Sequence, residues 1–246
     1  MENVLLVTLS RQMALRRELD VIANNVANVQ TNGFKRRLSD SREYQMPVAS
    51  DETFKRGNDR RISFVVDRGT PLDTSTGQLE PTGNPLDVAI NGDAWFKVQT
   101  PQGERYTRNG ALMINAQGRL VNSDGHTMIG EQGPFEFSTQ ERDLRIASDG
   151  TVSSSNGTRG KLSLVRFPNQ QVLENVGANL FTTRVQPEPA LQARVQSGYV
   201  ERSNVSPVVE MSRMIEVTRQ YQNIANLMSR TDETRRSAIQ KLGEPI

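Results

Sequence analysis

The sequence predicts an α+β protein in which a β-rich antiparallel body lies between an N-terminal and a C-terminal helix that pair as a coiled coil. Near both ends of the chain, apolar residues recur at spacings of three and four, which is the pattern that seats one helix against another. Between the ends, short apolar runs alternate with Gly, Asn, Asp and Thr, as is typical of strands and turns. Regular helices at both extremities indicate a filament or tube subunit more than an enzyme, because chain ends usually fray.

The composition excludes several classes of protein. Hydrophobic residues make up 35% of the 246 residues and aromatic residues 5%, which predicts a thin core. The 30 Lys and Arg nearly balance the 28 Asp and Glu, and nucleic-acid-binding domains cluster their basic residues. The longest basic run, Lys35-Arg36-Arg37, is flanked by Asp40 and Glu43, so we interpret it as a solvated face or helix end. We therefore expect no nucleic-acid partner.

Neither a metal site nor a membrane segment is expected. The chain has no cysteine, which excludes disulfides and thiolate chemistry and makes a zinc site improbable. The short apolar run Val4–Val7 follows Glu2 and lacks a basic segment before it, so it does not resemble a cleavable signal. No stretch approaches the roughly 20 apolar residues of a membrane span. The chain is thus expected to be cytosolic, or to leave the cell by a route that keeps its N-terminus.

The first helix is predicted from about residue 3 to about residue 29. Gly33 suits the left-handed position that closes a helix, and Phe34 can then fold back on Val29. Asn24 and Asn28 have two interpretations, because Asn is a poor helix former. They are solvated amides of a frayed helix end, or they face a partner helix and fix its register, as a buried polar residue does in a coiled coil.

The middle of the chain is predicted to be extended and then rich in hairpins. Residues 39–82 give weak signals and are expected to be extended with a few strands, one of which is placed at 62–66. From residue 84 onward, Leu86, Val88 and Ile90 alternate with polar or small residues, and Asn91-Gly92 is a hairpin signal. Further turn signals predict a meander of short antiparallel strands; they are Gln102-Gly103, Asn109-Gly110, Gln117-Gly118, Asp124-Gly125, Asp149-Gly150 and Asn156-Gly157.

The last helix is predicted from about Pro207 to about Leu242. Residues 187–196 form a connector before it. Asn204 or Ser206 can cap the helix, and Pro207 fits its first turn. Gly243 and Pro245 stop it. A helix of this size is about 50 Å long, which suits a coiled coil better than the core of a small domain.

Candidate catalytic residues are few. The single histidine, His126, follows a turn signal and is interpreted as a surface residue. A two-carboxylate glycosidase site remains an alternative, because the predicted β region contains Asp73, Asp87 and Asp93. Asp87 and Asp93 also fit strand-edge or turn roles. The lone tryptophan, Trp95, could stack on a sugar, but its place in a strand favours core packing. We assign no catalytic residue, cofactor or metal ligand.

Three segments resemble the family of bacterial flagellar rod and hook proteins. The first is Ala23-Asn24-Asn25-Val26-Ala27-Asn28, followed by Thr31, Gly33, Phe34 and Lys35. The second is Asn84-Pro85-Leu86-Asp87-Val88-Ala89-Ile90-Asn91-Gly92, followed by Tyr106-Thr107-Arg108-Asn109-Gly110, Gly118-Arg119-Leu120 and Asp124-Gly125. The third is Gly198-Tyr199-Val200-Glu201, followed by Ser203-Asn204-Val205, Glu210, Met211, Met214-Ile215, Arg219 and Tyr221. The segments occur in the family's order and bracket nearly the whole chain.

The resemblance implies a division of the chain and a set of assembly residues. It implies an N-terminal rod helix with the family motif (1–36), an extended connector (37–82), a β-rich body (83–197) and a C-terminal rod helix (198–246). Met211, Met214 and Met228 are interpreted as residues of the helix seam. The residues expected at assembly interfaces are Leu15, Leu19, Ile22, Asn24, Asn25, Val26, Asn28, Val29, Gly33, Phe34, Ser203, Asn204, Val205, Met211, Met214, Ile215, Val217, Tyr221, Ile224 and Met228.

The resemblance also implies a role and partners. The length and residues 230–239 resemble the proximal rod subtype, with the distal rod subtype as the alternative. Such a subunit passes unprocessed through the flagellar export apparatus, assembles in the periplasm with copies of itself and with neighbouring rod proteins including the distal one, and transmits torque in a hollow driveshaft. It catalyses no reaction. The alternative functions are a secreted β-rich carbohydrate-active protein and a cytosolic coiled-coil adaptor. The adaptor would leave the β-rich body unexplained.

Overall fold

The computed structural model of the protein describes residues 2–45, 63–138 and 141–243. The chain divides into two compact units, and each is built from separated pieces of sequence. The helical unit comprises Met1–Val26, Arg37–Pro71 and Pro207–Ile246; the β-rich unit comprises Ala27–Arg36 and Leu72–Ser206. The stretch that directly follows the first helix therefore belongs to the β-rich unit.

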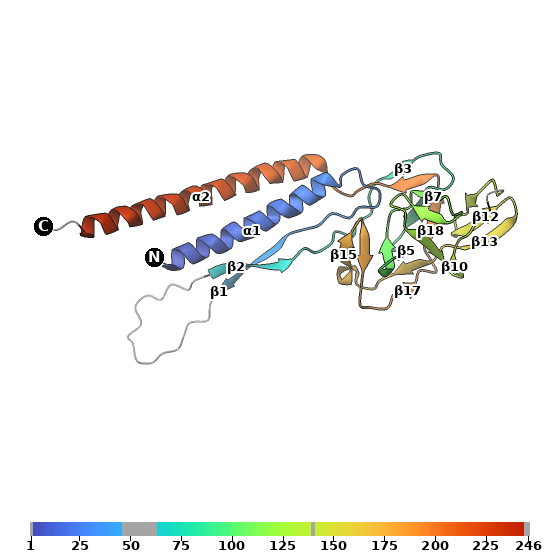
Figure 1. Ribbon diagram of the computed structural model, residues 1–246, viewed down its shortest axis with the longest axis horizontal. Helices are drawn as coiled ribbons and strands as arrows, with labels where there is room; N and C mark the ends of the chain where they lie inside the picture. Colours follow the sequence, from blue (N-terminus) through green and yellow to red (C-terminus); the bar gives the residue numbers. More distant parts are fainter. Residues whose placement is uncertain (1, 46–62, 139–140, 244–246) are drawn as a thin grey trace. The chain divides into compact units, whose positions relative to one another are not determined.

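Two helices dominate the helical unit, as predicted. Figure 1 shows α1, Glu2–Ala27, beside α2, Pro207–Gly243. α1 ends two residues before the predicted end, and the amide of Thr31 then donates to the carbonyl of Asn28 at 3.2 Å. Pro207 begins α2, where its missing N–H leaves no helical acceptor unsatisfied. Pro245, which was predicted to help stop this helix, lies outside the described residues.

The helical unit also contains a two-stranded antiparallel ladder of β1, Asp40–Gln45, and β2, Ser63–Gly69. The predicted strand at 62–66 is confirmed from Ser63 onward, while residues 46–62 of the predicted connector lie outside the described residues. β1 lies in the segment where a few strands were expected, but the sequence pattern could not place it, because its run Asp-Ser-Arg-Glu-Tyr-Gln has no apolar alternation. The amide of Val65 donates to the hydroxyl of Ser10 at 3.5 Å, so β2 lies against α1.

The β-rich unit consists of short strands and one 3₁₀ turn, η1, Gln170–Val172. Its strands are β3 Leu79–Pro81, β4 Val88–Asn91, β5 Trp95–Thr100, β6 Gly103–Thr107, β7 Leu112–Ile114, β8 Leu120–Asn122, β9 Thr127–Gly130, β10 Gly133–Pro134, β11 Arg145–Ile146, β12 Thr151–Ser154, β13 Gly157–Lys161, β14 Leu164–Arg166, β15 Glu174–Gly177, β16 Leu180–Thr182, β17 Glu188–Pro189, β18 Arg194–Ser197 and β19 Tyr199–Glu201.

These strands form one antiparallel sheet of ten strands and several small ones. The largest sheet of the described chain runs in the order β15-β16-β6-β5-β9-β8-β7, with β10 added to β9, β14 to β5 and β17 to β14. β11, β12 and β13 form a second sheet, and β18 pairs with β4 and β19 with β3. The predicted antiparallel β-rich body is thus confirmed, and so is the α+β class.

Five of the seven turn signals lie at a turn between paired strands. They are Gln102-Gly103 in β5–β6, Gln117-Gly118 in β7–β8, Asp124-Gly125 in β8–β9, Asp149-Gly150 in β11–β12 and Asn156-Gly157 in β12–β13. Asn109-Gly110 lies between β6 and β7, which do not pair with each other. The Asn91-Gly92 hairpin was wrong, because β4 pairs with β18 while β5 pairs with β6, β9 and β14. The guanidinium of Arg108 donates to the carbonyl of Gly92 at 2.8 Å, and the chain then enters a different sheet.

The predicted connector at 187–196 was also partly wrong. It contains β17 and most of β18, and Val195 of β18 pairs with Ile90 of β4. Val195 is 3% exposed. A strand this short offers one buried apolar residue, which is too little for an alternation to be recognised.

The core of the β-rich unit lies in two clusters. The larger contains side chains from β4, β5 and β7 to β9, together with Phe135, Ile146 and Leu162. The second surrounds Trp95, which is fully buried with its ring centroid 4.9 Å from that of Phe181. The predicted core role of Trp95 is therefore confirmed, and this residue has no exposed face for a sugar.

Candidate assembly site

An apolar seam joins the two helices of the helical unit. Leu15, Ile22 and Val217 are buried in it, and it is flanked by five partly buried residues, Leu19, Val26, Met214, Tyr221 and Ile224. Each fully buried side chain of this kind contributes about 1.5–3 kcal/mol. These residues were predicted from their spacing, and the structure brings them together within one chain.

Polar contacts beside the seam define the direction of the helices. Arg11 donates to the side-chain oxygen of Gln220 at 3.2 Å, and Arg213 donates to Glu18 at 2.9 Å. From the first contact to the second, the residue number rises from 11 to 18 on α1 and falls from 220 to 213 on α2, so the helices run antiparallel.

One buried amide closes the seam near the C-terminal end of α1. Asn25 is 1% exposed, and its Oδ1 accepts the Arg37 amide at 2.9 Å. Its Nδ2 donates to the Arg37 carbonyl at 2.9 Å and to Oε2 of Glu210, in the first turn of α2, at 3.3 Å. Glu210 is also 1% exposed. The side chain of Asn25 thus joins α1, the chain returning at residue 37, and α2.

Other predicted assembly residues lie away from the seam. Met211 is 53% exposed and Ile215 55% exposed, and both lie on the side of α2 that faces away from the seam. The interpretation of Met211 as a seam residue of this helix pair was therefore wrong, since it lies about 100° round the helix from the seam. Met228 and Val29 are half-buried outside the seam cluster. Asn24 is exposed, and Asn28 accepts a hydrogen bond from the Thr31 hydroxyl at 3.1 Å.

In the β-rich unit, the end of the N-terminal family motif is held by a buried carboxylate. Glu201 of β19 accepts a hydrogen bond from the ammonium group of Lys35 at 2.6 Å and another from the backbone amide of Gly77 at 3.1 Å. The guanidinium of Arg108 lies 3.5 Å from its other oxygen and over the ring of Trp95. Lys35, Arg108 and Glu201 are each 1% exposed.

The interpretation of Lys35 as part of a solvated face was therefore wrong. Two cations share one carboxylate inside the unit, where Lys35 also donates to the carbonyl of Ser75 at 2.7 Å. Burial lowers the pKa of Lys35 below its ordinary value, Glu201 raises it in part, and the neighbouring Arg108 lowers it further. Burial likewise lowers the pKa of Arg108, against the opposite effects of Glu201 and Asp93.

Gly33 makes this close approach possible. Its φ is +68°, as the predicted left-handed position requires, and its amide donates to the Glu201 carbonyl at 2.6 Å. A Cβ atom at this position would lie 2.4 Å from the carbonyl carbon of Arg108. Phe34, which follows it, is 4% exposed. Gly33 and Phe34 thus seat the end of the motif in the β-rich unit.

The third family segment contacts the first in the same place. Asn204 accepts the amide of Arg36 at 2.6 Å and donates to the carbonyls of Asp73 and Ser75, both at 3.0 Å. Its amide is therefore engaged here, which leaves Ser206 as the remaining predicted cap of α2. Ser203 accepts the amide of Val205 at 3.3 Å, and Val205 is 6% exposed.

Sequence reasoning did not identify the buried charged residues Lys35, Arg108, Glu201 and Glu210, although all four lie within the segments that resemble the family. Charged residues were interpreted as solvent-facing by default, since most of them are. The signal that could have identified Glu201 is its position directly after Tyr199-Val200 in a strand pattern, where a charge is out of place.

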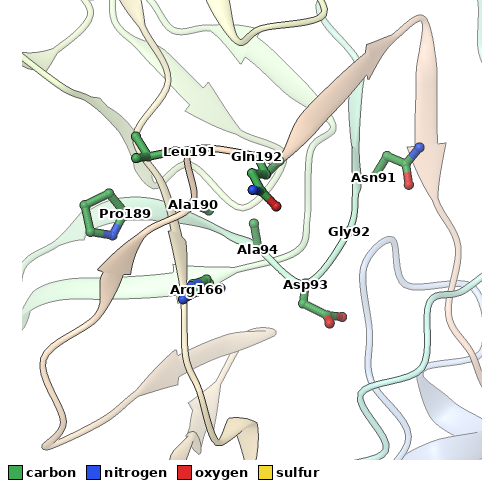
Figure 2. A pocket seen from close by; sticks show the side chains of 10 residues that line it. Asn91, Gly92, Asp93, Ala94, Arg166, Pro189, Ala190, Leu191 and Gln192 are labelled. Atoms are coloured by element: carbon green, nitrogen blue, oxygen red, sulfur yellow. The ribbon is translucent and has the colours of Figure 1, made fainter.

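The candidate catalytic residues do not converge. A pocket of about 450 Å³ in the β-rich unit contains Asp93 as the single carboxylate among its lining residues, which include no aromatic side chain (Figure 2). Arg166, another lining residue, forms an ion pair with Glu188. Asp87 accepts a hydrogen bond from the side-chain amide of Asn84, and Asp73 accepts one from the backbone amide of Ser75, as expected for turn carboxylates. His126 is half-buried, and its backbone amide donates to Asn122.

Neither helix of the described chain is long and apolar enough to cross a membrane.

Three family models match the chain in order. They are described as flagella basal body rod protein (residues 5–35), flagellar hook protein FlgE/F/G D1 domain (residues 89–154) and flagellar basal body rod FlgEFG protein C-terminal (residues 196–241). The first and third contain most of α1 and most of α2, and the second contains much of the large sheet.

Curated relatives match over the length of the chain. A flagellar basal-body rod protein FlgF from Caulobacter vibrioides is 38% identical, and one from Mesorhizobium japonicum is 35% identical, each over 99% of both chains. A flagellar basal-body rod protein FlgG from Bacillus subtilis is 32% identical over 88% of this chain and 90% of its own. The chain belongs to the family of flagellar basal-body rod proteins.

Proposed function

We propose that this chain is a structural subunit of the proximal part of the flagellar rod and that it catalyses no reaction. The observation that carries this proposal is the arrangement of the family segments: the two ends of the chain meet in one helical unit, and the middle segment builds a separate β-rich unit. The FlgF relatives from Caulobacter vibrioides and Mesorhizobium japonicum are 38% and 35% identical along 99% of both chains, whereas the FlgG relative from Bacillus subtilis is 32% identical over 88% of this chain. The higher identity to these two FlgF proteins favours the proximal subtype over the distal one, although a FlgF protein from Escherichia coli matches over only 90% of this chain.

The α1–α2 pair, which we take to be a coiled coil, would be the element that polymerises. Outside the seam, each helix carries an exposed apolar stripe at spacings of three and four. On α1 the stripe is Leu6, Leu9 and Met13, and on α2 it is Val208, Met211 and Ile215. Residues so spaced share one face of a helix. Exposed apolar stripes of this kind are typical of surfaces that neighbouring molecules cover.

The predicted assembly residues on the two helices then act in two ways. The seam residues, such as Leu15, Ile22 and Val217, hold the helix pair in the form that neighbours recognise. Exposed residues, such as Met211 and Ile215, contact those neighbours directly. Contacts between unlike faces of successive subunits generate an open helix when the rotation does not close, which is the geometry of a rod.

The partners in this proposal are other copies of the chain and neighbouring rod proteins, including the distal one. The subunit would pass through the flagellar export apparatus without loss of an N-terminal signal and assemble in the periplasm. There it would form part of the hollow driveshaft that carries torque from the motor to the hook.

The test is incorporation into basal bodies. In a strain lacking the wild-type protein, we expect the wild-type copy to co-purify with hook–basal bodies. We expect the triple variant Val208→Asp/Met211→Asp/Ile215→Asp to be absent from them while its helical circular dichroism persists. Leu191→Asp is the matched control, because Leu191 is an 83% exposed apolar residue of the β-rich unit. Absence of the wild-type protein from basal bodies would refute the rod assignment, and normal incorporation of the triple variant would refute the role of the α2 stripe.

A further inference from the structure

We propose that the side-chain amide of Asn25 fixes the register of α2 on α1. Asn25 is the asparagine of its motif that is buried against the second helix, whereas Asn24 is exposed and Asn28 is half-buried. Its oxygen and nitrogen both bond to the backbone of Arg37, and its nitrogen also reaches Glu210. A register role was predicted for Asn24 and Asn28; the contacts assign it to the residue beside Asn24.

The apolar seam by itself discriminates poorly between registers. Its members are aliphatic side chains and one tyrosine at repeated spacings of three and four, so sliding one helix by a turn replaces one apolar contact with another. A buried polar residue is the best-attested device for excluding such alternatives. Van der Waals contact is recovered after a slip, but a specific hydrogen bond is not.

The partners of Asn25 make a slip unfavourable. Asn25 and Glu210 are both 1% exposed, so a shifted helix would leave a buried amide and a buried carboxylate without each other. A hydrogen bond to a charged group contributes more than one between neutral groups, so losing the contact between Asn25 and the Glu210 carboxylate disfavours the slipped register. Because Asn25 also holds both backbone groups of Arg37, it cannot follow α2 without giving up that second pairing.

Introduced cysteines can report on the register directly, because the chain has none of its own. Three double-cysteine variants share Glu18→Cys. The second cysteine replaces Arg213, which contacts Glu18 in the structure, or lies about one turn to either side at Val209 or Glu216. A short bis-maleimide reagent applied to the purified full-length protein then measures which pairs come within reach.

In the wild-type background, we expect the 18/213 pair to cross-link in preference to the 18/209 and 18/216 pairs. Asn25→Ala should lower this preference about fivefold, as loss of one net hydrogen bond predicts. Glu210→Ala should act in the same direction, because it removes the partner on α2. Asn24→Ala, the matched control on the neighbouring exposed asparagine, should leave the preference unchanged.

Helical circular dichroism keeps the result interpretable. Alanine favours a helix more than asparagine does, so helix content should be retained in Asn25→Ala. An unchanged cross-linking preference in Asn25→Ala would overturn the proposal and leave the seam as the source of register. Loss of helix content would also overturn it, because Asn25 would then hold the helices themselves.

The consequence for assembly rests on the proposed function, since register decides how the exposed stripes of α1 and α2 line up for a neighbour. On that basis the Asn25→Ala protein should be depleted from basal bodies. The amount of the Asn24→Ala protein in basal bodies shows whether Asn24 has a separate role in assembly. Absence of the wild-type protein from basal bodies would refute the rod assignment and leave the cross-linking result intact. Normal incorporation of an Asn25→Ala protein whose register has slipped would refute the link between register and assembly.

Discussion

The carboxylate of Glu201 lies 2.6 Å from the ammonium nitrogen of Lys35, although the two residues are 166 positions apart in the chain. Both side chains are buried, and Arg108 approaches the second oxygen of the same carboxylate. One acidic side chain thus holds the end of the N-terminal motif and the middle segment of the family together inside the β-rich unit.

Removing this acid should be more damaging than removing one base. Glu201→Gln leaves Lys35 and Arg108 buried without a carboxylate, and breaking a buried ion pair in this way costs about 3–5 kcal/mol. Lys35→Met leaves Glu201 with Arg108 and should cost less. Chemical denaturation of the purified protein measures both free energies of unfolding. Equal stability of Glu201→Gln and the wild type would show that the carboxylate is dispensable.

Gly33→Ala should destabilise the β-rich unit through two effects. The left-handed backbone costs alanine about 1–2 kcal/mol, and the new Cβ would meet the backbone of Arg108 at 2.4 Å. Gly83→Ala is the matched control, because Gly83 has a similar φ of +74° and its added Cβ would have no neighbour within 4 Å. The difference between the two variants in urea denaturation isolates the effect of the close approach. Equal losses would mean that Arg108 moves aside freely.

Ile22→Asp and Ile224→Asp should abolish swimming while the β-rich unit still folds. Ile22 is 2% exposed in the seam, and an unpaired carboxylate buried there costs several kcal/mol. Every subunit of a rod would repeat the defect. Motility in soft agar measures the outcome, and Ala23→Asp at a neighbouring exposed position controls for the added charge. Normal swimming of the Ile22 variant would show that assembly does not need the seam.

Acid should weaken the β-rich unit in part through Glu141. The Ser154 hydroxyl, the Ser138 amide and the guanidinium of Arg159 bind this carboxylate and lower its pKa from 4.5 to about 2. Because the folded pKa lies below the unfolded one, the stabilisation is complete above pH 4.5 and is lost as the pH falls toward 2. Glu141→Gln should therefore lose stability at neutral pH and converge with the wild type near pH 2. Glu136→Gln, at an exposed glutamate, is the control; a constant difference between Glu141→Gln and wild type across this range would contradict the assignment.

His126→Ala and Asp93→Asn should change no enzymatic activity, because we expect the purified wild-type protein to release nothing from peptidoglycan. Among the residues that line its pocket, Asp93 carries the single carboxylate, whereas glycoside hydrolysis ordinarily needs two carboxylates. Turnover by the wild type that either substitution reduces would replace the structural interpretation with the carbohydrate-active one.

Local patterns predicted the parts of the fold that local forces decide. The helices followed from apolar spacing, Gly33 from its left-handed turn position, and Trp95 from its place in a strand. Lys35 and Glu201 were not predicted as partners, because their burial depends on each other across most of the chain. β1 could not be placed and most of β18 was taken for a connector, because pairing with β2 and β4 compensates for the weak patterns of these two strands. Asn25 was expected at an interface, but sequence spacing alone could not distinguish it from Asn24 and Asn28.

The placement of residues 31–36 in the β-rich unit has a consequence for the order of folding. Their partners Glu201 and Asn204 come late in the sequence, so these contacts close a very long loop and form slowly. When the chain emerges N-terminus first, residues 31–36 are present long before β19 has emerged. Neither unit can be completed early, because α2 follows the same late segment. The chain is therefore built to stay incompletely folded until almost all of it has arrived.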